Sequence, residues 1–304
     1  MGSMQLKGVS PAMVTPLTPD ERVDKAGMRN VVRYCLDGGV HGVVVLGTTG
    51  EFPAMTDAMR QGAIETVLNE VQGRVPVIVG CGDSGTQKTL AQVRAAAQTN
   101  ADAVLVAAPY YFPLDQAAVI RHYQIVADAS TVPVIVYHFP QMTKITYTPD
   151  TVAKLAAHPN IIGMKDSAGD FVAMQRFITA TAEQNFSVLS GLPALALPAF
   201  ELGATGGIFA GASLAPKLCA DVYNTWARGD HAAAVALQKQ VSLFALMGGF
   251  GPNSAVIKFG LNKMGICGAT VTAPLALNPG QEEKILAWMG RLGLQAPETA
   301  MIAG

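Results

Sequence analysis

The sequence predicts an α/β protein that folds as a (β/α)8 TIM barrel with a C-terminal helical extension. Two observations support this prediction: short apolar runs recur along the chain, and amphipathic segments of helical length lie between them. Most of the runs are continuously apolar, which is typical of parallel strands that are covered on both faces. The 304 residues are enough for one large α/β domain or two ordinary ones.

Eight candidate strands follow one another along the chain. They are residues 9–14, 42–47, 75–80, 103–109, 132–137, 161–165, 187–191 and 206–211. The clearest helical segments between them are residues 56–71, 86–98 and 116–129. Residues that suit helix N-caps precede or open several helices, namely Asp24, Thr56, Thr86, Asp115 and the pair Pro149-Asp150. Strands that alternate with helices in this way predict a barrel of parallel strands.

An open, doubly wound sheet is the main alternative fold. Such sheets often carry a Gly-x-Gly-x-x-Gly turn after their first strand, and this sequence has none there. The catalytic barrel is therefore expected to span residues 1–228. Residues 229–304 are expected to form a C-terminal helical region, with helices around residues 230–247, 253–264 and 281–292.

Composition argues against several classes of protein. A net charge of -1 and a pI near 6.5 do not favour a nucleic-acid partner or an anionic membrane. The four cysteines lack a Cys-x-x-Cys pair, so we expect reduced thiols in a cytoplasmic protein rather than a disulfide framework. The first eight residues contain no apolar signal core, and glycines interrupt the uncharged stretch at residues 240–257. No membrane span is expected.

The most informative polar residue is Lys165, which ends the apolar run at residues 161–165. In a barrel of this class, chemistry takes place at the C-terminal ends of the strands. The lysine stem could simply pack there while the ammonium pairs with Asp166 or another carboxylate. Alternatively, a desolvated lysine can lose its proton, attack a carbonyl carbon and form a Schiff base.

Other strand ends carry further polar residues. The sequence Gly-Thr-Thr-Gly-Glu at residues 47–51 is either a tight turn or a loop whose N–H groups and hydroxyls bind a carboxylate. Tyr137 either fills the barrel mouth or transfers protons, and Tyr111 follows the fourth strand. The five histidines lack metal-ligand spacing, so no metal site is expected. There is also no Gly-x-Ser-x-Gly motif that would indicate a serine hydrolase.

Together these segments resemble the dihydrodipicolinate synthase / N-acetylneuraminate lyase family. The resemblance rests on GTTGE at residues 47–51, PYY at 109–111, Tyr137-x-x-Pro140 and GMKDSAG at 163–169. It covers nearly the whole chain, and the combination of motifs in this order is far more specific than any one of them. It implies a class I, pyruvate-handling lyase or synthase on a barrel. It also implies a homotetramer, a dimer of dimers, with no cofactor beyond a covalent imine.

The resemblance also implies a role for each matched residue. Lys165 would form the imine with pyruvate or another 2-keto acid, and Tyr137 would be the general acid and base. Thr48 would relay protons to Tyr137. Tyr111 would cross a dimer interface to complete that relay. The residues that would bind substrate or line the site are Gly47, Thr49, Gly191 and Ile208.

One stretch departs from the pattern of dihydrodipicolinate synthases. Those enzymes read Tyr-Asn-x-Pro-x-Arg-Thr after the fifth strand, and this chain reads YHFPQMT at residues 137–143. Met142 thus stands where an arginine would bind the carboxylate of the second substrate, and a thioether cannot replace a bidentate guanidinium. Lys144 is an alternative point charge. His138 and Gln141 become candidates to bind substrate hydroxyls.

The departure favours an aldolase that releases pyruvate from a 2-keto-3-deoxy sugar acid or a 4-hydroxy-2-oxo acid. Two alternatives within the family are a dihydrodipicolinate synthase, which condenses pyruvate with aspartate semialdehyde, and a keto-acid dehydratase. A third alternative is a relative that binds a keto acid without turning it over. The intact set of Lys165, Tyr137, Thr48 and Tyr111 weighs against that third alternative.

Overall fold

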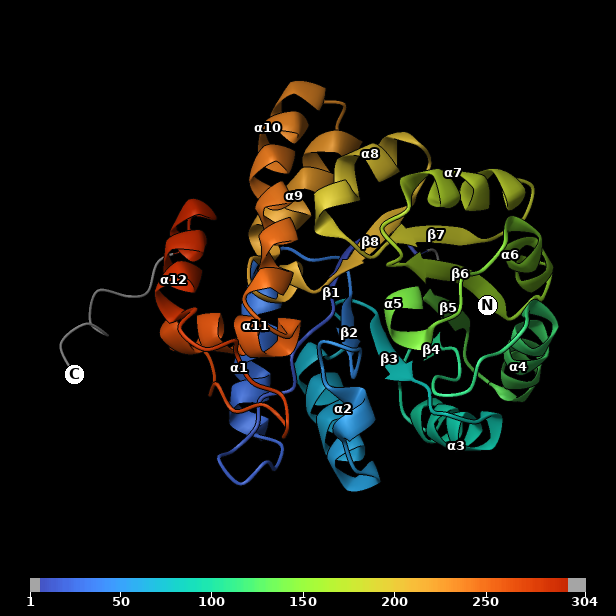
Figure 1. The fold of residues 1–304 in the computed structure, drawn as a ribbon, viewed down its shortest axis with the longest axis horizontal. Helices are drawn as coiled ribbons and strands as arrows, with labels where there is room; N and C mark the ends of the chain where they lie inside the picture. Colours follow the sequence, from blue (N-terminus) through green and yellow to red (C-terminus); the bar gives the residue numbers. More distant parts are fainter. Residues whose placement is uncertain (1–5, 295–304) are drawn as a thin grey trace.

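The computed structural model describes residues 6–294, and its centre is a barrel of eight parallel strands surrounded by helices (Figure 1). The strands are β1 (Gly8–Pro11), β2 (Val43–Val45), β3 (Val77–Cys81), β4 (Ala103–Ala107), β5 (Val134–His138), β6 (Ile161–Asp166), β7 (Ser187–Ser190) and β8 (Gly206–Phe209). Neighbours in the chain are neighbours in the sheet, and β1 pairs with β8. A parallel bridge between Ala12 and Val44 closes the ring between β1 and β2. The predicted barrel is confirmed.

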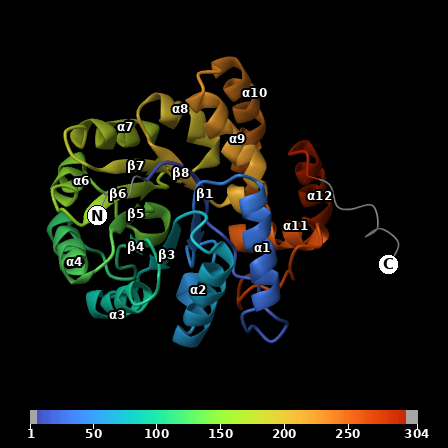
Figure 2. The ribbon, with the colours of Figure 1, turned by 180° about the vertical axis from the view of Figure 1, so that it is seen from behind.

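Helices follow most of the strands and cover the outside of the barrel (Figures 1 and 2). They are α1 (Lys25–Asp37), α2 (Asp57–Val71), α3 (Thr86–Ala97), α4 (Gln116–Ala129), α5 (Pro140–Thr143), α6 (Pro149–Ala156), α7 (Phe171–Ala180), α8 (Ala196–Glu201) and α9 (Pro216–Ala227). Because helices cover one face of the sheet and side chains fill the barrel, every strand is buried almost throughout.

The observed helix caps agree with the predicted ones at three helices and differ from them at two. The side chains of Asp24, Thr56 and Asp115 accept N–H groups in the first turns of α1, α2 and α4, as predicted. Thr86 is instead the first helical residue of α3, and its hydroxyl bonds to a histidine of α4. Thr148, rather than the pair Pro149-Asp150, caps α6. Pro149 occupies the first helical position, where a backbone N–H would have no acceptor within the helix, so the proline loses no hydrogen bond there.

The C-terminal helices gather on one side of the barrel, beside α1 and α9 (Figures 1 and 2). They are α10 (His231–Val241), α11 (Asn253–Lys263) and α12 (Glu282–Arg291), close to the predicted ranges. Residues 242–249 form a 3₁₀ helix rather than a continuation of α10. The boundary expected at residue 228 falls between α9 and α10, which pack against each other, and the division into two regions stays a prediction.

A buried ion pair ties α11 to the loop that follows β2. The Lys258 ammonium lies 2.6 Å from Oε1 of Glu51, and both side chains are fully buried. The second oxygen of Glu51 accepts the backbone N–H and the hydroxyl of Thr272, and Lys258 donates to the Thr270 carbonyl. Burial lowers the pKa of Lys258, and the adjacent carboxylate opposes that shift. The pair therefore anchors the C-terminal region to the barrel mouth.

Within residues 6–294, no single helix has both the length and the apolar composition to cross a bilayer. Residues 231–249 and 253–263 meet those two criteria only when taken together, and they are bent by 115° at the break between them.

Candidate active site

The site is built around two residues at the ends of neighbouring strands. Tyr137 on β5 pairs in register with Lys165 on β6, and the Lys165 ammonium lies 4.4 Å from the centre of the tyrosine ring. Both side chains are about 5% exposed. Within the described residues the Lys165 ammonium forms no ion pair, because Asp166 is bonded to His138 instead. The structure therefore does not support the alternative in which the Lys165 ammonium only pairs with a carboxylate.

The loop after β2 brings two threonines to the same place. The Thr48 hydroxyl lies 3.3 Å from the Tyr137 hydroxyl, so a proton can pass between them along a hydrogen bond. The loop begins where Leu46 adopts a φ of 58°, which ends β2 after Val45. This turn explains why β2 is shorter than the predicted run at residues 42–47.

Gly191 supports the site through a close approach of two loops. Its N–H donates to the Asp166 carbonyl at 2.6 Å. A Cβ at this position would lie 1.9 Å from the Ser167 hydroxyl oxygen and 2.8 Å from the Asp166 carbonyl. Only glycine therefore allows the loop after β7 to pack against the end of β6 beside Lys165.

These residues line a cavity of about 480 Å³ at the C-terminal end of the barrel. From the barrel, its lining consists of Thr48, Thr49, Tyr137, Phe139, Met142, Lys165, Ser167, Gly191, Leu192 and Ala210. From the C-terminal region, it consists of Gly251, Pro252, Asn253, Ser254 and Leu275. Lys165 is the charged side chain among these residues, and the polar remainder is neutral. The cavity is thus suited to a small acid whose other groups are uncharged.

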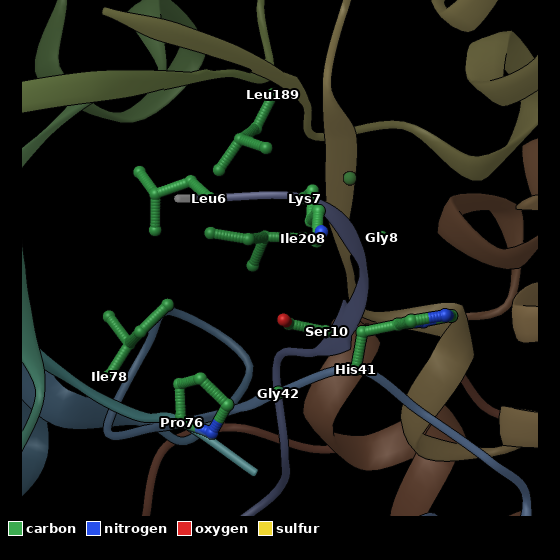
Figure 3. Close-up of a pocket in the computed structure, with 11 residues that line it drawn as sticks. Leu6, Lys7, Gly8, Ser10, His41, Gly42, Pro76, Ile78, Leu189 and Ile208 are labelled. Atoms are coloured by element: carbon green, nitrogen blue, oxygen red, sulfur yellow. The ribbon is translucent and has the colours of Figure 1, made fainter. Parts of the chain in front are cut away.

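Ile208 lies elsewhere. It lines a much smaller cavity of about 30 Å³ near the N-terminal ends of the strands, together with Ser10, His41 and Leu189 (Figure 3). Barrel strands are tilted and staggered, so the distance of a residue from its strand end does not alone set its level in the barrel. Ala210, two residues further on, reaches the larger cavity instead.

The structure corrects the expectation that His138 binds substrate. Its ring is 1% exposed and lies on the outer face of β5, because successive residues of a strand point to opposite faces and Tyr137 points inward. The Nδ1 atom is 2.8 Å from Asp166 Oδ1, and Nε2 accepts the Tyr147 N–H at 3.2 Å. Both nitrogens are thus occupied outside the cavity.

Gln141 and Tyr111 also lie outside the cavity lining of this chain. The exposed Gln141 amide donates to the Ala168 carbonyl at 2.7 Å. Tyr111 is 86% exposed, has a φ of 104° and packs edge-on against Phe112. A relay from Tyr111 to Thr48 is therefore not formed within a single chain.

Several lining residues were not identified from the sequence. Phe139 and Ser167 lie two positions beyond Tyr137 and Lys165, so strand alternation alone could have placed them on the inner face. The Phe139 ring stacks on Tyr137 with the centroids 5.7 Å apart. No local pattern marks residues 251–254 and Leu275, because they reach the site only through the packing of the C-terminal region. Within the described chain, no three His, Cys, Asp or Glu side chains are placed to hold a metal ion.

Known proteins resemble this chain in sequence and in structure. Residues 5–287 match the model of the dihydrodipicolinate synthetase family. A 4-hydroxy-tetrahydrodipicolinate synthase of Methanopyrus kandleri is 40% identical over 228 residues, which is 74% of this chain and 76% of that protein. An uncharacterised DapA-like lyase of Halobacterium salinarum is 36% identical over 290 residues, 95% of each chain.

Two solved structures share the fold over almost the whole chain. A crystal structure of dihydrodipicolinate synthase (dapA) has a TM-score of 0.89 at 31% identity, covering 95% of this chain and 100% of its own. YagE of E. coli K12, a prophage protein solved in complex with pyruvate, has a TM-score of 0.90 at 28% identity, with 96% and 100% covered. The chain is therefore an enzyme of the lyase class and belongs to the dihydrodipicolinate synthetase family.

Proposed function

We propose that this enzyme is a class I aldolase that releases pyruvate from a 2-keto-3-deoxy sugar acid or a 4-hydroxy-2-oxo acid. The observation that supports the mechanism is the buried Lys165 ammonium beside Tyr137, in a cavity of about 480 Å³ and without a carboxylate partner among residues 6–294. A lysine in such surroundings is suited to nucleophilic attack on a ketone. The observation that supports the substrate class is Met142 at the cavity rim.

The reaction begins when the free amine of Lys165 attacks the C2 carbonyl of the substrate. Tyr137 gives its proton to the departing hydroxyl, so that water leaves and a positively charged iminium remains as the electron sink, with no cofactor needed. The Tyr137 phenolate then takes the proton of the C4 hydroxyl, and the C3–C4 bond breaks with its electrons moving to the iminium. An aldehyde leaves, the resulting enamine is protonated at C3, and water releases pyruvate from Lys165.

The loop after β2 would serve both binding and proton transfer. Thr48 is hydrogen-bonded to Tyr137 and can pass its proton onward. Thr49 lines the cavity, and with the backbone from Gly47 it would bind the keto-acid carboxylate. Because the Glu51–Lys258 pair holds this loop, the carboxylate contact would be fixed before substrate arrives.

Replacing Tyr137 with phenylalanine is expected to lower kcat by about 10²–10⁴-fold. The ring would still fill its place between Lys165 and Phe139, so only the acid–base hydroxyl is lost. Pyruvate should still form an adduct with Lys165 upon borohydride reduction. Steady-state kinetics and intact-protein mass measure the two quantities separately, and turnover near the wild-type value would assign the phenol a purely structural role.

The residues at the rim of the cavity favour a substrate that is uncharged in the part that leaves as the aldehyde. Met142 is 58% exposed at this rim, where an arginine would meet the carboxylate of aspartate semialdehyde. Lys144 does not take over that role, since its ammonium donates to the Gln141 carbonyl and it does not line the cavity. Asn253 and Ser254 offer neutral donors and acceptors, which suit the hydroxyls of a sugar acid.

Cleavage of 2-keto-3-deoxy sugar acids is expected to exceed condensation with aspartate semialdehyde by at least about tenfold in kcat/KM. A missing charge-assisted contact of this kind costs on the order of 1.5–3 kcal/mol. A head-to-head assay of both reactions on one preparation measures the ratio.

The variant Met142→Arg should raise condensation by about tenfold or more, and the matched variant Met142→Leu should change neither reaction appreciably. Efficient condensation by the wild type, with no cleavage across a panel of keto acids, would support the synthase alternative instead. That alternative is favoured by the names of several relatives that are 32–40% identical to this chain.

We also propose that the enzyme assembles as a homotetramer, a dimer of dimers. The exposed pair Tyr111 and Phe112 would lie in a dimer interface, where Tyr111 of one subunit could complete the Thr48–Tyr137 relay of the other. Analytical ultracentrifugation measures this assembly, and a monomer at micromolar concentration would contradict it.

The four free cysteines support the predicted cytoplasmic location.

A further inference from the structure

A histidine–aspartate pair lies directly behind the two catalytic residues. His138 follows Tyr137 on β5, Asp166 follows Lys165 on β6, and the register pairs each with its counterpart across the two strands. Tyr137 and Lys165 point into the barrel, so His138 and Asp166 point outward, toward α7. The pair is buried, with side chains 1% and 0% exposed, and its Nδ1–Oδ1 distance is 2.8 Å.

The hydrogen bonds define where the protons are. Nε2 of His138 accepts the Tyr147 N–H, so it carries no proton, and Nδ1 must donate to Asp166. Oδ1 of Asp166 accepts a second N–H, from Ala168 at 3.1 Å. The carboxylate is thus bonded both to the histidine of β5 and to the chain that follows β6.

Aromatic side chains pack around the pair on the outer face of the sheet. The Tyr147 ring stacks on His138 with the centroids 4.5 Å apart, and Phe177 of α7 contacts the same ring edge-on. Tyr123 of α4 is bonded to the Tyr147 hydroxyl. These contacts hold the His138 ring in the position from which Nδ1 reaches Asp166.

The strand register shows what the pair can do. The ladder between β5 and β6 shifts by one residue near its start, where Val134 pairs with Ile161 but Ile135 pairs with Gly163. A slip of one residue moves every side chain to the other face of the sheet, so register must be fixed near the site. The His138–Asp166 bond spans the two strands at the position next to Tyr137 and Lys165.

We propose that His138 and Asp166 are positioning residues for the catalytic pair. Their hydrogen bond holds β5 and β6 in the register that places Lys165 beside Tyr137. This inference rests on the proposed imine chemistry for its activity readout, but the placement of Lys165 beside Tyr137 exists without any substrate.

Two variants of Asp166 test the acceptor side of this bond. Asp166→Leu removes the acceptor and should lower turnover by about 10²-fold, the scale of effect that a displacement of about 1 Å produces. Asp166→Asn keeps an oxygen that can accept from His138 and should retain most of the activity.

The matched control is Asp128→Leu. Asp128 pairs with His158 at 3.1 Å and its side chain is 75% exposed, so this variant should leave turnover unchanged. Turnover of Asp166→Leu equal to that of the wild type and the control would overturn the positioning role. If wild-type Lys165 forms no adduct with pyruvate, the proposed function fails instead, and a crystal structure of Asp166→Leu still tests whether Lys165 keeps its place 4.4 Å from the Tyr137 ring.

Two variants of His138 test the register. His138→Leu removes the donor and should lower turnover by about 10²-fold, the scale of effect that a displacement of about 1 Å produces. His138→Asn keeps an N–H for Asp166 and should recover most of that loss. Circular dichroism and thermal melts confirm that both variants fold. Equal turnover of the leucine variant and the wild type, or equal losses in both variants, would overturn the positioning role.

Discussion

Replacing Lys165 with methionine is expected to lower pyruvate formation by at least about 10⁴-fold, because Lys165 supplies the amine in the cavity lining of the described chain. The fold should remain intact. Methionine resembles the lysine stem in length, and the buried ammonium has no ion-pair partner in the described chain that would be left unpaired. Initial rates with a pyruvate-coupled assay measure the loss, and a thermal melt measures stability.

The matched control is Lys144→Met, close to the same cavity. The ammonium of Lys144 is exposed and donates to the Gln141 carbonyl, so its loss should change turnover by less than about threefold. Turnover of the Lys165 variant within tenfold of the wild type would show that another group carries out the chemistry.

Replacing Lys258 with methionine is expected to lower the free energy of unfolding by about 3–5 kcal/mol. The variant would leave the Glu51 carboxylate buried without its cation, although Thr272 would still donate two hydrogen bonds to it. Activity should fall as well, since the loop that carries Thr48 and Thr49 ends at Glu51. Urea denaturation measures the stability change.

The double variant Glu51→Gln, Lys258→Met should recover much of that stability. The neutral amide oxygen of glutamine at position 51 can still accept hydrogen bonds from Thr272, and both charges of the buried pair are removed together. The exposed pair Lys217–Asp221, 2.7 Å apart on α9, supplies the control, and Lys217→Met should change stability little. Equal stability of the wild type and the Lys258 single variant would show that the buried pair does not anchor the C-terminal region.

The barrel could be predicted because its signals are local. Continuous apolar runs indicated all eight strands, and Asp24, Thr56 and Asp115 marked helix starts. The exact ends of the strands could not be predicted, because they depend on backbone dihedral angles that tertiary contacts stabilise. Leu46 shows this, since its left-handed φ ends β2 at Val45, although the apolar run predicted a strand up to residue 47.

The site could be predicted only where sequence motifs marked it. Lys165, Tyr137 and Thr48 do meet in space, as the motifs and the family resemblance indicated. His138 was placed wrongly because it was grouped with its neighbour Tyr137, although strand alternation turns it to the other face. The wall formed by Gly251–Ser254 and Leu275 could not be found, because it depends on how the C-terminal helices pack on the barrel.

Borohydride reduction in the presence of pyruvate tests the central claim most directly. If Lys165 forms the imine, peptide mass spectrometry should find one reduced three-carbon adduct, located on Lys165 and absent from the methionine variant. An adduct on another lysine, or no adduct at saturating pyruvate, would contradict the assignment of Lys165 as the Schiff-base residue.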